Sequence, residues 1–222
     1  MRQISRLSVI AVSIALLMAL SSCSDTQNTP ETDDQPSTPT ENRETVTSGQ
    51  ISDVPENNNA GGESPQGSVT DAANFEITEN EDGTVTISRY IGTETDIVIP
   101  SQIGGKNVSA IGNVTGTTGA FEGCTSITAV VIPDSVTEIQ DNAFYDCTSL
   151  ETVTIPSSVT LLRNCAFCDC PNLRAVYFKG DAPQQSNYVF DSTENVTMYY
   201  QDGTSGWENP WHGRPAEVYI PE

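Results

Sequence analysis

Hydrophobic positions recur at a fixed spacing in the second half of the chain. An apolar pair ending in Phe returns every 23 residues, and further apolar columns keep the same frame behind it. The pairs are Ala120-Phe121, Ala143-Phe144, Ala166-Phe167 and Val189-Phe190, and the columns are Cys124/Cys147/Cys170, Ile127/Leu150/Leu173/Val196 and Val130/Val153/Val176/Tyr199. A fixed period in the twenties is typical of a solenoid, in which stacked neighbours bury the apolar face that one unit cannot bury alone. The pattern predicts a mostly β repeat solenoid with one parallel sheet of stacked coils.

The repeated frame also resembles a known family. The motif AF-x-x-C-x-x-L-x-x-V-x-I-P-x-x-V-x-x-I is similar to the BspA-like branch of bacterial leucine-rich repeats, from about Phe75 to the C-terminus. The resemblance implies a right-handed horseshoe or short arc, of the kind found on surface proteins that bind other proteins. Residues 75–222 are therefore expected to form a leucine-rich-repeat domain with a cap at each end.

The two ends of the repeat domain carry different patterns. Phe75–Thr78 and Thr84–Ile87 alternate apolar and polar residues around Asp82-Gly83, which indicates a β-hairpin. Because a solenoid needs atypical units to cover its ends, this hairpin is expected to be the N-terminal cap. Residues 203–215 break the 23-residue frame and resemble the family's irregular C-terminal cap, with Trp207 folded over the last coil.

The N-terminus has the features of an export signal. Arg2 and Arg6 precede an apolar run over Leu7–Leu20 that is too short for a comfortable membrane span. The run ends in Leu20-Ser21-Ser22-Cys23, which resembles a bacterial lipobox. That resemblance implies that residues 1–22 are a lipoprotein signal peptide and that Cys23 carries the lipid that holds the protein on a membrane. The alternative is an ordinary cleaved signal peptide in which Cys23 has no role.

Residues 23–74 are expected to form a disordered acidic tether behind the lipidated Cys23. Residues 24–74 contain no aromatic residue and carry ten Asp and Glu against the single Arg43, so they offer little apolar surface to offset the entropy of ordering. The whole chain has a net charge of −21, which argues against nucleic acid as a partner. The lipobox and leucine-rich-repeat resemblances together imply a lipid-anchored, surface-exposed protein of the bacterial cell envelope, on the outer membrane or the outer face of the cell membrane.

The cysteines allow two further interpretations. Cys124, Cys147 and Cys170 occupy equivalent repeat positions, where small buried cysteines are ordinary core residues. Cys165 and Cys168 replace residues that vary between repeats, so they are the candidate disulfide pair outside the cytoplasm. A metal site is disfavoured because Cys170 belongs to the core column and three ligands do not close a structural zinc site.

The sequence offers no sign of catalysis. The single histidine, His212, lies in the irregular C-terminal segment, and the chain has neither a glycine-rich phosphate loop nor an H-E-x-x-H motif. We therefore expect a non-enzymatic protein that needs no cofactor.

The outward-facing strand positions are the candidate binding residues. Side chains alternate along a strand, so the neighbours of the inward Val and Ile residues should point to solvent. The candidates on this face are Val131, Thr154, Tyr177, Tyr200 and Tyr219, with Arg174 on the same sheet. They fit adhesion to an extracellular protein, such as host matrix or another cell surface, or alternatively a carbohydrate-binding accessory module of a surface glycan system. A purely structural tyrosine ladder is a third interpretation, because cross-strand aromatic pairs stabilise sheets by themselves.

Overall fold

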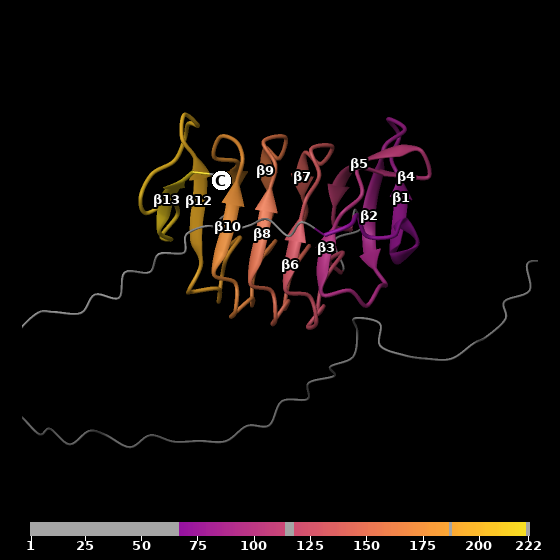
Figure 1. Cartoon of the computed structure of the whole chain (residues 1–222), viewed down its shortest axis with the longest axis horizontal. Coiled ribbons are helices and arrows are strands. Elements are labelled where there is room, and N and C mark those ends of the chain that lie inside the picture. Colours follow the sequence, from indigo (N-terminus) through magenta and orange to yellow (C-terminus); the bar gives the residue numbers. More distant parts are fainter. Residues whose placement is uncertain (1–66, 114–117, 187, 221–222) are drawn as a thin grey trace, which may run out of the picture.

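The described part of the protein is a short stack of β coils. The computed structural model describes residues 67–113, 118–186 and 188–220. In these residues the only helical element is the 3-10 turn η1 (Ala72–Asn74), and the rest consists of strands joined by turns (Figure 1). The predicted signal peptide, Cys23 and most of the tether lie outside the described residues. Residues 67–74, the last of the predicted tether, are described by the structure. Among them Thr70 is buried, and its N–H donates to the Val98 carbonyl at 2.9 Å.

An antiparallel hairpin begins the stack, as the alternating pattern predicts. Strand β1 (Phe75–Glu79) pairs with β2 (Val85–Tyr90), and the turn between them contains Gly83 at a φ of 84°. Phe75 is only 6% exposed and Val85 is fully buried, so the hairpin covers the N-terminal end of the core.

The main sheet is parallel and follows the repeat. Its order is β13-β12-β10-β8-β6-β3, with one strand from each successive coil. The strands are β3 (Asp96–Val98), β6 (Ala129–Val131), β8 (Thr152–Ile155), β10 (Ala175–Phe178), β12 (Thr197–Gln201) and β13 (Ala216–Tyr219). All neighbours pair in parallel, which confirms the predicted stacking.

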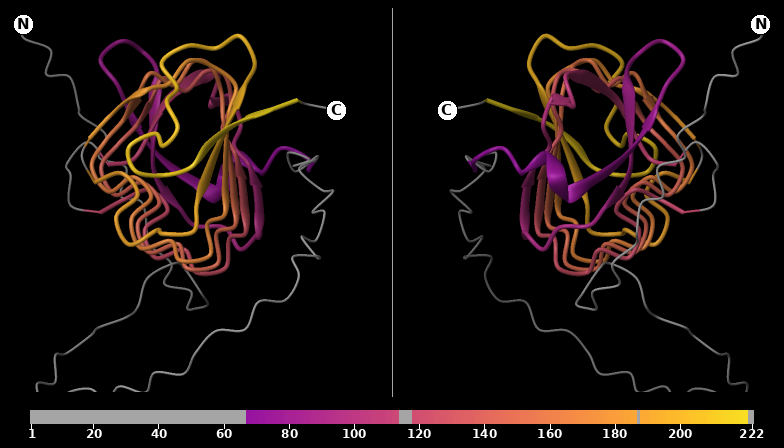
Figure 2. Two further views of the ribbon diagram at one scale, coloured as in Figure 1. Left: turned by 90° about the vertical axis from the view of Figure 1, so that its left-hand side faces the viewer. Right: turned by 90° about the vertical axis from the view of Figure 1, so that its right-hand side faces the viewer.

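The expectation of a single sheet is wrong, because a second sheet runs along the other side of the coils. Its path is β1-β2-β5-β7-β9-β11, and β4 pairs with β5. Besides the hairpin it contains β4 (Gln102–Ile103), β5 (Lys106–Ile111), β7 (Glu138–Ile139), β9 (Leu161–Leu162) and β11 (Gln184–Gln185). Figure 2 shows the coils end-on, one behind another, so equivalent backbone groups of neighbouring coils face each other on both sides. Backbone N–H and C=O groups that leave solvent need partners, and the short second ladder supplies them.

Aromatic rings form the axis of the core. Tyr90 and the four repeat phenylalanines stack in chain order at centroid distances of 5.3, 4.7, 5.1 and 5.4 Å, with interplanar angles of 22° or less. Phe121, Phe144 and Phe167 are fully buried, and so is Leu150 in the neighbouring column. The core therefore contains the columns that the repeat predicts, except in the last coil.

The cysteine column has a polar function inside this core. The Cys170 thiol donates to the Phe144 carbonyl oxygen of the preceding coil at 3.1 Å, and Cys147 makes the equivalent bond one coil earlier. In the last coil the position is held by Thr193, whose hydroxyl donates to the Phe167 carbonyl at 2.7 Å and accepts from the Cys170 N–H at 3.0 Å. A small side chain with a donor is thus required at this position, because it satisfies a buried carbonyl.

Candidate binding face

The outer face of the six-stranded sheet carries the predicted binding column. Strand pairing places Val131, Thr154 and Tyr177 opposite one another on β6, β8 and β10. The column continues to Tyr199 on β12, which pairs with Tyr177. Val131 and Tyr177 are half-buried, whereas Thr154 is only 3% exposed and so presents little surface to a partner.

The structure corrects the prediction for Tyr200. In the last coil Met198, fully buried, pairs with Val176 and takes the inward position that the 23-residue frame assigns to Tyr199. The coil is one residue shorter between Val196 and Met198 than its predecessor is between Leu173 and Val176. Because side chains alternate, a shift of one residue exchanges the two faces of a strand. Tyr199 therefore joins the outer face, and Tyr200 packs against the core.

Three tyrosines meet on this outer face, and we call Tyr177, Tyr199 and Tyr219 the tyrosine cluster. The Tyr177 and Tyr199 rings stack at 5.2 Å with an interplanar angle of 18°. Tyr219 pairs in the sheet with Gln201 and not with the predicted tyrosine column, yet its ring meets Tyr177 edge-on at 5.3 Å. Gln201 Nε2 donates to the Tyr219 hydroxyl oxygen at 3.4 Å. The prediction of a tyrosine patch is thus retained with one member exchanged.

The cluster offers aromatic rings and, at Tyr177 and Tyr219, neutral hydroxyl groups. Burial raises the pKa of Tyr177 above its ordinary value, and the nearby Tyr199 and Tyr219 add to the rise. Burial also raises the pKa of Tyr219, although the hydrogen bond from Gln201 opposes the increase. A tyrosine whose pKa exceeds its usual value of about 10 stays protonated at neutral pH. These hydroxyls can therefore donate and accept hydrogen bonds.

Two cations lie at the ends of β10, beside the cluster. Arg174 precedes the strand and Lys179 follows it, and both side chains are exposed. Neither forms an ion pair with another described residue, whereas Lys106 pairs with Glu79 and Arg163 with Glu138 elsewhere in the domain. Strand β10, which carries Tyr177, is thus flanked by two exposed positive charges in a strongly acidic chain.

The C-terminal cap closes over the last coil, as predicted. The Trp207 ring stacks on Tyr200 at 5.0 Å, with an interplanar angle of 3°, and its Nε1 donates to the Gly180 carbonyl at 3.3 Å. Trp211 is 4% exposed and packs on the Phe178 ring. Trp211 is therefore part of the core, whereas Trp207 packs against the core and is half-buried, as the three cluster tyrosines are.

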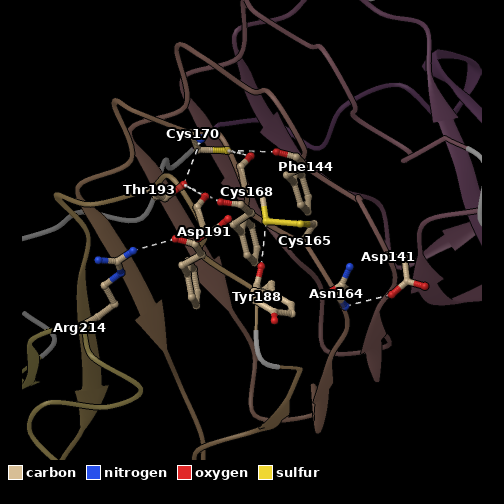
Figure 3. The surroundings of a disulfide bond; sticks show 12 residues. Asp141, Phe144, Asn164, Cys165, Cys168, Cys170, Tyr188, Asp191, Thr193 and Arg214 are labelled. Atoms are coloured by element: carbon tan, nitrogen blue, oxygen red, sulfur yellow. Dashed lines mark hydrogen bonds between the residues drawn. A yellow bond between two sulfur atoms is a disulfide. The ribbon is translucent and has the colours of Figure 1, made fainter. Parts of the chain in front are cut away.

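A disulfide joins Cys165 and Cys168 within one turn, with the Cα atoms 4.7 Å apart (Figure 3). This is the pair that the sequence favours. Cys124, Cys147 and Cys170 lie outside this disulfide and are buried. Among the described residues, no group of three His, Cys, Asp or Glu side chains is arranged to hold a metal ion.

The described surface also has an open hollow of about 610 Å³ beside β9 and β11. Its only ionisable lining residue is Asp181, and that carboxylate accepts a hydrogen bond from the Ser205 N–H at 2.7 Å. His212 lies elsewhere, exposed in the cap, with its ring edge-on to Trp211. The hollow therefore does not bring an acid and a base together.

Comparison with known proteins shows which family the repeats resemble. Residues 106–205 match a family model described as BspA type Leucine rich repeat region, in six copies. Among solved structures, a leucine rich cell surface protein from Faecalibacterium prausnitzii is 31% identical over 68% of this chain and 42% of its own, with a TM-score of 0.50. A leucine-rich repeat protein from Bacteroides capillosus is 26% identical over 60% of this chain and 99% of its own, with a TM-score of 0.49. No curated protein matches this sequence.

The chain spans less than half the length of the Faecalibacterium protein. Within the described residues, no helix has the length and apolar character needed to cross a membrane.

Proposed function

We propose that this chain, a BspA-type leucine-rich repeat protein over residues 106–205, is a non-enzymatic module that binds an extracellular protein at the bacterial cell surface. The observation that carries the proposal is the tyrosine cluster, with Arg174 and Lys179 beside it. Tyr and Arg are enriched where protein interfaces concentrate their binding energy. The likeness to a leucine rich cell surface protein supports a location at the cell surface.

The geometry of the tyrosine cluster suits a binding face that is rigid before its partner arrives. The cluster stands on β10, β12 and β13, whose backbones are hydrogen-bonded into the sheet, so little side-chain or backbone order has to be gained on binding. Tyrosine adds large contact area at a small entropic cost, because it has only two side-chain torsions. A partner from host matrix or from another cell would then contact a preformed face.

A glycan remains the second candidate ligand. The stacked rings of Tyr177 and Tyr199 present apolar faces beside the Gln201 amide and the Tyr219 hydroxyl. Sugar rings stack on aromatic faces through their C–H groups, while their hydroxyls bond to such polar groups. The same residues would therefore serve a carbohydrate-binding accessory module.

We expect the double substitution Tyr177→Thr and Tyr199→Thr to weaken binding by at least about 30-fold, which is the effect of losing a single interface hot spot of about 2 kcal/mol. Threonine keeps strand propensity, and Thr154 already holds this position one coil earlier. The experiment screens the chain against extracellular matrix proteins and a glycan array, then titrates the variant with each partner found.

The matched control is Tyr188→Thr, which removes a tyrosine that is 59% exposed on a turn outside the sheet. Its affinity should equal that of the unmodified chain. If the double variant is folded by circular dichroism and still binds fully, recognition does not use the tyrosine cluster, and the proposal fails.

Anchoring through Cys23 is part of the same proposal. An N-terminal cysteine that carries several acyl chains would hold the repeats at a membrane. Each buried CH₂ contributes about 0.8 kcal/mol, and stable anchoring needs more than one chain. We expect Cys23→Ala to move the protein from the detergent phase to the aqueous phase in a phase-partition assay. Cys124→Ala, which changes a buried core thiol, is the control and should leave partitioning unchanged. A protein from bacterial membranes that retains Met1 would contradict the anchor.

A further inference from the structure

The last strand of the six-stranded sheet has an outer edge that no other strand of the described residues pairs with. β13 is paired on one side with β12, where the Met198 N–H donates to the Pro215 carbonyl. In a parallel ladder, alternate residues direct their peptide groups to opposite sides of the strand. The Ala216 N–H already points away from β12, since it donates to Asn209 Oδ1 at 3.2 Å. The peptide groups of Val218 therefore also point outward, and such an edge can pair with another strand.

Apolar side chains are uncovered along this edge. Val218 continues the inward column of Phe178 and Tyr200, yet it is 49% exposed, because no further described coil lies beyond β13 (Figures 1 and 2). Ile220, on the same side by strand alternation, is 83% exposed. The corresponding inward residue Ile155, inside the stack, is fully buried. The core column thus ends in two apolar residues that another strand would cover.

The opposite edge of the same sheet is closed. Thr70 donates its N–H to the Val98 carbonyl at 2.9 Å, and its Oγ1 accepts from the Val98 N–H at 3.1 Å. This contact occupies the outer side of β3, so β13 of one molecule cannot extend the β3 edge of another. β1, the edge strand of the other sheet, carries Glu76, and a register that opposed it to Glu217 would be destabilised by like charges.

We propose that β13 pairs antiparallel with β13 of a second copy of this chain, which gives a two-fold dimer with one continuous parallel-antiparallel-parallel sheet. With the dyad at Val218, the two Val218 residues face each other. Ala216 faces the second copy's Ile220, whose carbonyl replaces Asn209 Oδ1 as the acceptor of the Ala216 N–H. Glu217 then faces the second copy's Tyr219, whose hydroxyl can donate to the carboxylate. The two Glu217 carboxylates are thereby kept out of direct opposition, and each partner covers the other's exposed apolar residues.

Such a dimer closes on itself. A two-fold contact uses the same patch on both copies, so it does not propagate into a fibre. The dyad is perpendicular to the sheet, and therefore the outer faces of both copies point to the same side. Two tyrosine clusters would then be presented together, which raises avidity for a repeated partner. The dimer itself does not depend on what the tyrosine cluster binds.

Sedimentation equilibrium over a hundred-fold range of concentration tests the dimer, on the chain beginning at residue 23 with Cys23→Ser. The unmodified edge should give a monomer–dimer equilibrium. Val218→Lys and, separately, Ile220→Lys should each raise the dissociation constant at least about ten-fold, because charge replaces apolar contact at or beside the dyad. Ile220 is so exposed that its substitution should leave the fold intact. Val69→Lys, a 61% exposed valine next to Thr70 at the far edge, is the control and should dimerise normally.

Oxidative cross-linking tests the register. Val218→Cys should form a disulfide between copies, whereas Glu217→Cys, which faces the second copy's Tyr219, should cross-link far less. The three cysteines outside the intrachain disulfide are buried and should not compete. A monomer at every concentration, a dimer that survives both lysine variants, or equal cross-linking of the two cysteine variants would overturn the proposal.

Discussion

Replacing Phe144 with alanine should lower the free energy of unfolding by about 3–5 kcal/mol, the range for removing a buried aromatic ring. Phe144 stands in the middle of the ring stack, 4.7 Å from Phe121 and 5.1 Å from Phe167, and it is fully buried. Its removal leaves a cavity lined by rings that the sheets on both sides hold in place. Collapse is therefore limited, and the cost should lie in the upper half of that range.

Urea unfolding followed by circular dichroism and by tryptophan fluorescence measures this loss. Stability in a solenoid is coupled through neighbouring coils, so both signals should change in one transition. Phe190→Ala is the comparison, since that ring is 7% exposed at the end of the stack and touches one repeat phenylalanine instead of two. A Phe144→Ala cost at or below that of Phe190→Ala would show that the rings do not act as a continuous core.

The repeat frame could be predicted because every stacked coil has to bury the same positions. A change at one of them would misalign the apolar columns of its neighbours, so Leu150 and Val153 keep their spacing and are fully buried. The second sheet could not be predicted in the same way. Strands such as Glu138–Ile139 and Leu161–Leu162 have only two residues, which is too short to show an alternating pattern.

The last coil was harder to predict because two different residues fit the same column. Tyr199 lies at the 23-residue position, but Met198 is the apolar side chain that fits between Val176 and Ala216. Nothing in the fixed frame signals the missing residue between Val196 and Met198. The unbranched Met next to a polar-tipped Tyr was the available clue, since the buried position favours the side chain without a hydroxyl.

The candidate site was only partly predictable, because contacts between its residues depend on parts of the fold that the repeat does not specify. Tyr177 and Tyr219 could be placed on the outer face, yet the contact between their rings depends on the cap that returns β13 to the sheet. Thr154 lies in the predicted column, but its burial depends on neighbours that a repeat pattern does not specify. Cys23 lies outside the described residues, and its acylation remains a prediction.

Tyr199 and Tyr200 are adjacent in the chain, and their substitution by threonine should have opposite consequences. Tyr200→Thr should lower the free energy of unfolding by about 2 kcal/mol, roughly half the cost of deleting a fully buried ring, because Tyr200 is half-buried against the core. Tyr199→Thr should cost about 1 kcal/mol or less, since it removes one stacked contact on an outer face. The same chemical change thus measures the two faces of β12 separately.

Fluorescence gives this comparison a local readout. The Trp207 ring is parallel to that of Tyr200 at 5.0 Å, so Tyr200→Thr should expose the indole and shift its emission to longer wavelength in the folded protein. Tyr199→Thr should leave the emission unchanged and reduce partner binding instead. If Tyr199→Thr were the more destabilising variant and shifted the emission, the 23-residue frame would hold through the last coil, and Tyr200 rather than Tyr199 would belong to the binding face.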